Sequence, residues 1–588
     1  MKRSFKVFLL FFISVLFFQC QKEISYVGGP DNQPTLPNPI TATLQGNVID
    51  ETGQPAAGVS VQVGAKTATT DAKGYFRITA AALDKNTALV TAQKNGYFKA
   101  YRSFSATAGT NQVRIKLVKR DLAGTVDGTA GGEATLANGS KVALPGGGVV
   151  VASSGAAYAG AVKVYAAYID PSASDIGETV PGNFTANDKD GKRVTLTSYG
   201  MLAVELEGAG GEKLQIKSGA EATLTTAIPA STLGAAPATI PMWYVDEATG
   251  VWKEEGSATK SGNSYVGKVK HFSFWNCDVS QNAVILTVTL KNSEGYPLVH
   301  AKVRIKRTTS SWAVYGYTDS LGVVSGYVPN GEALTLDVLN QCDASIYNQA
   351  LAAMSQNTVL APITIGSTAT AIVTIKGKLL NCTNAAVTNG FALINYGAQT
   401  YHAGVNAAGE FSIAIVTCTN TIANTNITGI DNAAQQQSSP VTVPITTPIT
   451  NAGNISVCGT SSAQFINYTL DGTAYSITST NPNDSLTGYT LDSVANAQKR
   501  TFLNGMTMGT TNKLNLRFNH TAFVSGTYPA SELIVNGFTQ TTLTQPFNVI
   551  VTAMPTAIGQ YYEGSFSGSF TSGGNHTISG TFRIRRLQ

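Results

Sequence analysis

Short runs in which every second residue is apolar dominate the chain from residue 41 onward. Residues 44–50, 59–63 and 113–117 show this alternation, and Gly, Pro or Asp residues separate one run from the next. A period of two is typical of a strand with one buried face, and the separating residues are turn formers. Helical periodicity is sparse and predicts only one short helix, at residues 344–355. The pattern therefore predicts an all-β fold.

The first predicted unit spans residues 42–119 and combines such strands with two tight turns. Gly53 and Gly74 supply the backbone freedom that these turns require, and the Asp71 side chain can hydrogen-bond the turn backbone. The motifs are Gly46-x-Val48, Gly53-x-Pro55, Val59-x-Val61 and Thr70-Asp71-x-x-Gly74-x-Phe76. Together they resemble the carboxypeptidase regulatory-like domain, a small transthyretin-like β-sandwich. The resemblance implies this fold and an exported protein but no reaction, because the domain is an appendage to the peptidase in the parent enzymes.

A second copy of this pattern spans residues 282–376. It repeats both turns, as Gly295-Tyr-Pro297 and Thr318-Asp319-Ser-Leu-Gly322, but it carries Val324 where the first unit has Phe76. Residues 377–461 form a third, divergent copy that lacks the Gly-x-Pro turn and the Thr-Asp pair. Three related units in one chain predict a string of β-sandwich modules, regulatory-like or immunoglobulin-like, and favour a scaffold over a single catalytic domain.

Two other β units complete the predicted order. Residues 462–588 form a C-terminal β domain that ends in two alternating runs separated by Gly573-Gly574-Asn575, which predicts a hairpin. Residues 120–281 carry the motifs Val142-Ala-Leu144-Pro145, Tyr168-Ile-Asp170-Pro171, Ser198-Tyr-Gly200, Met242-Trp243-Tyr244 and His271-Phe-Ser-Phe-Trp275-Asn276. This set resembles the extracellular β module of cartilage intermediate layer proteins and of related bacterial lipoproteins. The resemblance carries no known chemistry.

The N-terminal residues have the features of a targeting segment. Lys2, Arg3 and Lys6 are basic, residues 7–18 are almost entirely apolar, and Cys20 follows. The apolar run is shorter than the roughly 20 residues that a membrane-spanning helix needs. These features resemble the signal of a bacterial lipoprotein of the Bacteroidota type.

This resemblance implies that residues 1–19 are a signal peptide and that the Cys20 thiol carries the lipid. Residues 20–41 then form a flexible polar tether, rich in Asn and Pro, between the lipid and the first sandwich. Acyl chains would anchor the protein to the membrane, which places it in the cell envelope, at the outer membrane, on its periplasmic or its surface face. An ordinary secretory signal with an incidental Cys is the alternative.

Composition narrows the classes of partner. The chain has 588 residues, which is more than a single hydrophobic core accommodates. Only 13% of its residues are charged. The net charge of +5 is small and not clustered, so nucleic acid is excluded as a partner. No Lys or Arg occurs between Lys378 and Lys499, where Asn and Thr dominate. Such a neutral surface suits a solvated stalk or contacts with neutral glycans.

Five cysteines remain when Cys20 is set aside. Cys277 makes their number odd, so at least one is unpaired or pairs between chains. Candidate disulfides lie among Cys342, Cys382, Cys418 and Cys458. The last three share one predicted unit, which favours one bridge inside that unit, although the sequence leaves the connectivity open.

The sequence contains no recognisable catalytic or metal-binding motif. None of the five His residues is followed by Glu three positions later, so the zinc-binding His-x-x-Glu of the carboxypeptidases is absent, as is His-Glu-x-x-His. Gly564-Ser-Phe-Ser-Gly568 has Phe566 where a nucleophile elbow needs Ser. The sequence therefore predicts no catalytic residues, no metal and no cofactor.

Several side chains are candidate ligand contacts. Trp243 and Trp252 flank a predicted turn and could stack against a sugar if they share an exposed face. His271 and Trp275 lie in an aromatic-rich run and could contact a ligand through their rings. Core packing is the alternative for all four and is favoured, with the ring nitrogens bonded to backbone groups. Asp71 and Asp319 could ligate calcium, but turn formation explains them better, because a calcium loop offers more oxygens.

Three functions are compatible with these features. The favoured one is a non-catalytic cell-envelope lipoprotein that serves as a scaffold, adhesin or partner-binding module, with an envelope protein or a glycan as its partner. A carbohydrate-binding accessory lipoprotein is the first alternative. A hydrolase whose catalytic residues come together from distant positions is the second.

Overall fold

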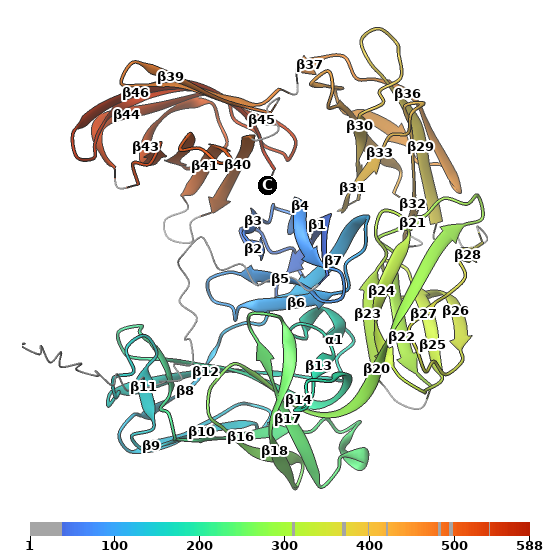
Figure 1. Cartoon of the computed structure of the whole chain (residues 1–588), viewed down its shortest axis with the longest axis vertical. Coiled ribbons are helices and arrows are strands. Elements are labelled where there is room, and N and C mark those ends of the chain that lie inside the picture. Colours follow the sequence, from blue (N-terminus) through green and yellow to red (C-terminus); the bar gives the residue numbers. More distant parts are fainter. Residues whose placement is uncertain are drawn as a thin grey trace, which may run out of the picture. The chain divides into compact units, whose positions relative to one another are not determined.

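The computed structural model describes residues 38–308, 312–366, 372–397, 399–418, 422–461, 463–479, 484–492, 498–539 and 541–587. Strands dominate these residues, which confirms the predicted all-β class (Figure 1). Helical structure in the described residues is limited to α1 (Ile176–Thr179) and a 3-10 turn, η1 (Leu233–Ala235). No helix of the described residues is long and apolar enough to cross a membrane.

The first module is a two-sheet sandwich. One sheet has the order β4-β1-β7 and the other β3-β2-β5-β6. Phe76 and Val48 are fully buried between the sheets. Gly74 has a φ of 68°, and a Cβ there would lie 2.1 Å from the carbonyl oxygen of Val48, so the turn requires glycine. The strands are β1 (Pro39–Ile49), β2 (Ser60–Val63), β3 (Lys66–Thr69), β4 (Tyr75–Asp84), β5 (Ala88–Gln93), β6 (Ala100–Phe104) and β7 (Thr110–Lys116).

The second module is built from β8 to β19 and the first half of β20, around two hydrophobic clusters. One cluster contains Trp275, and the other contains Trp243 and Trp252. Its strands are β8 (Leu122–Asp127), β9 (Gly131–Thr135), β10 (Lys141–Pro145), β11 (Val149–Val151), β12 (Ala161–Ile169), β13 (Thr185–Asn187), β14 (Arg193–Glu207), β15 (Lys213–Ile216), β16 (Ala222–Ala227), β17 (Thr239–Asp246), β18 (Val251–Ser261) and β19 (Ser264–Val269).

One long strand joins the second module to the third. β20 runs over 19 residues, Phe274–Asn292. Its residues 274–282 pair with β14, whereas residues 283–289 pair with β24 (Val323–Pro329), and residues 290–292 pair with β28 (Ile363–Ile365). The two modules are therefore connected by continuous backbone hydrogen bonding and not by a linker.

The third module, the second regulatory-like sandwich, packs the β20–β24 layer against a four-stranded sheet of order β23-β22-β25-β26. The predicted helix at residues 344–355 is wrong, because residues 345–351 form β26. Asp343 takes a φ of 61° and turns the chain back, so that this segment pairs with the edge of β25. The remaining strands are β21 (Leu298–Val299), β22 (Lys302–Arg307), β23 (Ala313–Tyr317), β25 (Leu334–Leu339), β26 (Ser345–Leu351) and β27 (Thr358–Val359).

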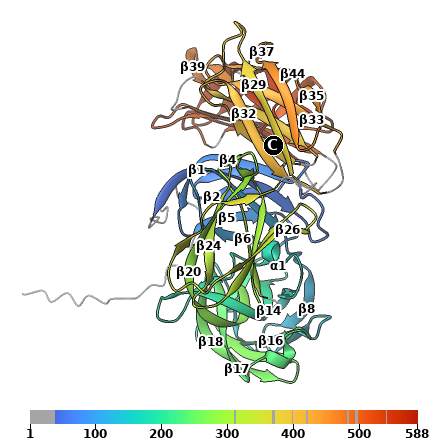
Figure 2. The same ribbon diagram turned by 90° about the vertical axis from the view of Figure 1, so that its right-hand side faces the viewer.

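The fourth module is the divergent sandwich, and it shares a sheet with the third. β21 of the third module pairs with β32, which gives the sheet order β21-β32-β29-β36 (Figure 1). Figure 2 shows β29 and β32 of this sheet side by side. The second sheet has the order β31-β30-β33-β34-β37, with β35 paired to β33. The strands are β29 (Ile372–Leu380), β30 (Gly390–Tyr396), β31 (Gln399–Gly404), β32 (Glu410–Val416), β33 (Asn424–Asp431), β34 (Gln436–Gln437), β35 (Val441–Pro444), β36 (Ile449–Ser456) and β37 (Thr460–Ser461).

The C-terminal module is a nine-stranded antiparallel sheet of order β39-β38-β46-β45-β44-β43-β42-β41-β40. β45 and β46 form the predicted terminal hairpin, with Thr571 paired to Asn575 next to the turn. Phe547, Phe566 and Phe570 fill its core. The strands are β38 (Phe465–Leu470), β39 (Thr473–Thr478), β40 (Asp484–Asp492), β41 (Lys499–Thr507), β42 (Lys513–His520), β43 (Gly526–Val535), β44 (Thr542–Ala553), β45 (Tyr561–Thr571) and β46 (Asn575–Arg585).

Candidate functional site

The three tryptophans considered as ligand contacts are core residues of the second module. Trp243 and Trp252 are fully buried, and Trp275 is 2% exposed. Each indole N–H donates to a backbone carbonyl, at 3.1, 2.8 and 3.0 Å respectively. The hypothesis of sugar stacking by Trp243 and Trp252 is therefore wrong, and Trp275 offers no exposed ring to a ligand, because the strands are buried on both faces at these positions.

His271 lies at the edge of this core and is 30% exposed. Its ring meets the edge of Tyr244 at 4.7 Å between centroids and lies 5.1 Å from the ring of Trp275. The Glu255 carboxylate is 3.8 Å from its Nε2. These contacts hold the imidazole in the packing of the turn that precedes β20.

A chain of hydrogen-bonded polar side chains is buried inside the same module. Ser198 Oγ donates to Asn276 Oδ1, and Asn276 Nδ2 donates to Asp278 Oδ2, both at 2.6 Å. Asn276 and Asp278 are fully buried, and Ser198 is 7% exposed. Burial raises the pKa of the Asp278 carboxyl well above its usual value. A serine and an acid held in this way are shielded from any substrate, so the arrangement is structural.

Replacing Asp278 by Asn is expected to remove a pH-dependent destabilisation of this module. The native carboxyl keeps a proton that the unfolded chain loses near pH 4, because burial raises its pKa. The contribution of Asp278 to stability is complete below about pH 4 and falls by about 1.4 kcal/mol for each pH unit as the pH rises toward the native pKa. Thermal unfolding should show Asp278→Asn equal to the wild type at pH 4 and more stable at pH 7.5.

Asp337→Asn is the control, because the stability that Asp337 contributes should change with pH in the opposite direction. Hydrogen bonds from Asn348 and Arg304 outweigh burial and lower the pKa of the Asp337 carboxyl. The contribution of Asp337 to folding stability is complete above the pKa that this carboxyl has in the unfolded chain, and it is lost as the pH falls below that value. Equal pH profiles for Asp278→Asn and the wild type would contradict the buried neutral acid.

The structure pairs four of the cysteines. Cys382 bonds to Cys458 within the fourth module, and Cys342 bonds to Cys418, which links the third module to the fourth. Cys277 is a buried free thiol, and burial raises its pKa, so it is not a reactive thiolate. The proposed lipidation residue, Cys20, lies outside the described residues.

Asp71 and Asp319 serve the turns in which they lie. Asp71 Oδ1 accepts the N–H groups of Lys73 and Tyr75, each at 2.8 Å, and Asp319 Oδ1 accepts two turn N–H groups in the same way. Asp319 Oδ2 also accepts the N–H of Gly109, in the first module, at 3.0 Å. In the part of the chain that the structure describes, no group of three or more His, Cys, Asp or Glu could hold a metal ion.

Side chains from three modules meet at the buried carboxylate of Glu178. This residue lies on α1 of the second module and is 6% exposed. Arg114 Nε of the first module lies 3.2 Å from Oε2. Lys302 Nζ of the third module lies 3.1 Å from Oε1, to which Tyr317 also donates at 3.1 Å. One carboxylate therefore binds the first and third modules to the second.

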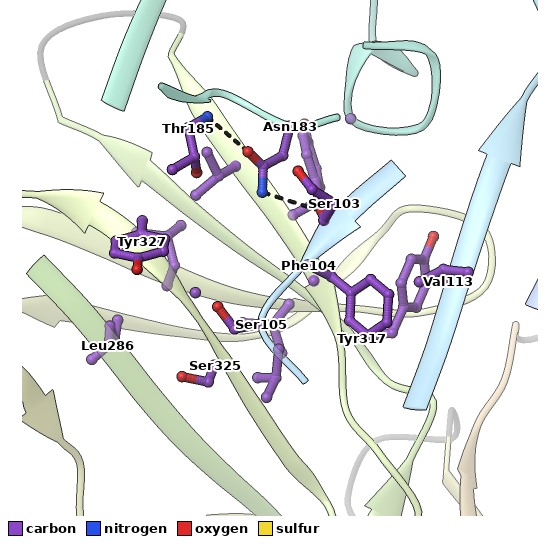
Figure 3. A pocket seen from close by; sticks show the side chains of 18 of the residues that line it. Ser103, Phe104, Ser105, Val113, Asn183, Thr185, Leu286, Tyr317, Ser325 and Tyr327 are labelled. Atoms are coloured by element: carbon purple, nitrogen blue, oxygen red, sulfur yellow. Dashed lines mark hydrogen bonds between the residues drawn. The ribbon is translucent and has the colours of Figure 1, made fainter. Parts of the chain in front are cut away.

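A cleft of about 100 Å³ opens beside this junction (Figure 3). It is lined by β6 and β7 of the first module, by residues 177–185 of the second, and by β20 and β22 to β24 of the third. Asn183 fixes one side of it, since its Nδ2 donates to the carbonyl of Ser103 at 3.1 Å and its Oδ1 accepts the N–H of Thr185 at 2.7 Å. The third module contributes an apolar wall that includes Val303, Val314 and Val324.

The sequence did not point to the cleft or to Glu178. The residues that form them come from three modules and share no local motif, so periodicity and spacing cannot bring them together. One signal was present: Val324 stands in the second copy where Phe76 stands in the first. In the first module Phe76 is fully buried, whereas Val324 lines the cleft.

Comparisons with known proteins bear on individual modules. Residues 43–118 match the family model of the carboxypeptidase regulatory-like domain, which confirms the resemblance of the first unit. Over 110 residues the chain is 28% identical to human cartilage intermediate layer protein 2, a match that covers 19% of this chain. The chain spans 9% of the length of that curated relative.

Solved structures of similar β proteins include two pilins and a DUF3823 family protein. GBS52, the minor pilin of Streptococcus agalactiae, is 8% identical, and the match covers 30% of this chain and 97% of that one with a TM-score of 0.13. The shaft pilin spaA of Lactobacillus rhamnosus GG is 8% identical over 31% of this chain and 99% of its own, with a TM-score of 0.16. A DUF3823 family protein of Bacteroides ovatus is 9% identical over 37% and 99%, with a TM-score of 0.12.

Proposed function

We propose that this chain, whose residues 43–118 form a carboxypeptidase regulatory-like domain, is a non-catalytic scaffold or adhesion lipoprotein of the bacterial cell envelope. In this proposal the lipid on Cys20 anchors the protein in the outer membrane, and the β modules present a surface to an envelope protein.

The way in which the modules are joined carries the proposal. β20 belongs to the sheets of the second and third modules, and β21 adds a strand of the third module to a sheet of the fourth. The Cys342–Cys418 disulfide and the Glu178 cluster add covalent and ionic links between modules. Modules joined by shared strands keep their surfaces in register, which a scaffold needs and which a set of independent binding domains on linkers does not provide.

Two observations count against the alternatives. The tryptophans that suggested a glycan platform are buried, so they give no support to the carbohydrate-binding function. The serine and acid of the buried Ser198–Asn276–Asp278 chain are shielded from substrate, so this chain gives no support to a hydrolase.

Replacing Cys20 by Ala is expected to release the protein from membranes. A single acyl chain contributes about 0.8 kcal/mol per buried methylene, so loss of the lipid removes most of the membrane affinity. The measurement is the fraction of intact protein in the membrane pellet after fractionation of cells. Cys277→Ala, at a buried thiol, is the matched control and should stay in the pellet. Unchanged partitioning of Cys20→Ala would reject the anchor.

The scaffold function is tested separately by cross-linking in intact cells. We expect the wild-type protein to be recovered with a defined envelope protein, and Glu178→Gln, which weakens the junction between modules, to be recovered with less of it. A specific hydrolytic activity that one substitution abolishes would overturn the proposal.

A further inference from the structure

Unpartnered polar atoms are concentrated in the cleft between the first three modules. Seven buried side-chain atoms have no hydrogen-bond partner in the described residues, and three of them belong to neighbouring residues that line this cleft: Arg102 Nη1, Ser103 Oγ and Gln112 Oε1. Arg102 is 7% exposed and Ser103 is 1% exposed. A buried donor or acceptor without a partner costs about 1–3 kcal/mol, and more when it is charged. Three such atoms on one cleft therefore point to a ligand that pairs with them.

The charges beside the cleft do not balance. Arg114 and Lys302 contact the two oxygens of Glu178, and Tyr317 donates to the same carboxylate. Arg102 forms no ion pair with any described residue, although Glu178 and Tyr317 are close enough to act on it electrostatically. Burial lowers the pKa of its guanidinium. Lys302 also pairs with Asp343, whereas no described carboxylate pairs with Arg102. A buried guanidinium binds a carboxylate through two parallel hydrogen bonds.

The other part of the cleft is apolar and small. Val303, Val314 and Val324 line it, together with Leu286, Val288 and Ile305, all from the third module. Val324, at the motif position where the first module has the buried Phe76, has a smaller side chain than phenylalanine. A cavity of about 150 Å³ holds benzene, so the volume of about 100 Å³ here suits a smaller group, such as a branched chain of four carbons.

We propose that this cleft binds a carboxylate attached to a short branched apolar group, with the carboxylate on Arg102 and Ser103 and the apolar group against Val324. The same chemistry occurs in a free short-chain acid and in the C-terminal residue of a peptide that ends in leucine. Gln112 Oε1 accepts a hydrogen bond from a ligand N–H, which a peptide has and a free acid lacks. This inference goes beyond the scaffold function, which holds whether or not the cleft is occupied.

Calorimetric titration of the full-length Cys20→Ala protein tests the proposal. The probes are 3-methylbutanoate, its uncharged amide, and N-acetyl-Gly-Gly-Leu with a free carboxylate. We expect at least one carboxylate probe to bind and the amide to bind about tenfold more weakly or not at all, because it lacks the charge that pairs with Arg102. If only the peptide binds, the natural ligand is the C-terminus of a peptide chain. If 3-methylbutanoate binds as well, the site recognises only the carboxylate and the branched apolar group that both probes share.

Two variants and a control locate the site. Arg102→Met keeps an unbranched side chain and removes the unpaired charge, so it should fold at least as well as the wild type and lose about tenfold or more in affinity. Val324→Phe fills the apolar part with the residue that the first module already accommodates and should lose affinity similarly. Lys99→Gln removes a nearby positive charge that does not line the cleft and should bind normally. Thermal unfolding verifies that each variant is folded.

The proposal is overturned if neither carboxylate binds the wild-type protein, or if folded Arg102→Met binds as the wild type does. Neither result contradicts the scaffold function, because membrane partitioning of the protein and its cross-linking in cells do not depend on whether the cleft is occupied.

Discussion

Glu178→Gln is expected to lower the free energy of unfolding of the joined modules by about 3–5 kcal/mol, since removing one member of a buried ionic cluster leaves its partners uncompensated. Lys302 is most affected, because its side chain is 10% exposed and its other anionic neighbour, Asp343, is 66% exposed and largely solvated. Tyr317 also loses its acceptor. The loss falls on the first three modules together, because Glu178 connects all three.

Chemical denaturation, followed by tryptophan fluorescence, measures this effect. The chain has four tryptophans, all buried: Trp243, Trp252 and Trp275 on strands of the second module, and Trp312 in the core of the third. Glu133→Gln is the matched control: its ion pair with Lys141 is about 40% exposed on both sides and should contribute less than about 1 kcal/mol. Equal destabilisation by the two substitutions would show that Glu178 does not hold the junction.

Replacing Cys382 and Cys458 together by Ala is expected to destabilise the fourth module by up to about 4.5 kcal/mol, from the entropy that a crosslink across 76 residues removes from the unfolded chain. This module has few charged side chains and no Lys or Arg between Lys378 and Lys499, so ionic links cannot replace the bridge. We expect a lower denaturation midpoint for this module and faster cleavage of it by protease at 37 °C.

The other disulfide should behave differently. Cys342 and Cys418 lie in different modules, so their joint replacement by Ala should weaken the connection between the third and fourth modules more than the folding of either one. β21 and β32 still pair across this boundary in such a variant. Cys277→Ala, which breaks no disulfide, is the control for both pairs. If the two double variants have the same protease pattern, the assignment of one bridge to folding and the other to assembly is incorrect.

The link between stability and function lies in these junctions. A scaffold needs its modules held together, and the chain does this with a shared strand, a shared sheet, a disulfide and one buried carboxylate. The cleft lies where three of these modules meet, so a ligand bound there adds contacts to the same junction. Occupancy should therefore raise the melting temperature of the first three modules, by mass action on the native state.

Local chemistry let the sequence determine the strands and their turns. Alternation along residues 113–117 predicts β7 because side chains in a strand point to opposite faces, and the Thr70-Asp71-x-x-Gly74 motif predicts its turn because Asp71 bonds the backbone and Gly74 takes a positive φ. The same reasoning extends to the second copy and to the terminal hairpin. These features depend on residues a few positions apart, which a sequence shows directly.

Tertiary structure decided everything that depends on long-range contact. Alternation cannot say whether Trp243 faces a core or a ligand, and only the neighbouring strands bury it. The segment 344–355 has residues that suit a short helix. Residues 345–351 instead form a strand that pairs with the edge of β25, because the backbone hydrogen bonds at this edge outweigh a weak helix propensity. Arg102, Glu178 and Val324 meet only because three modules close around them. Their positions follow from packing between modules, and no local pattern of residues encodes that.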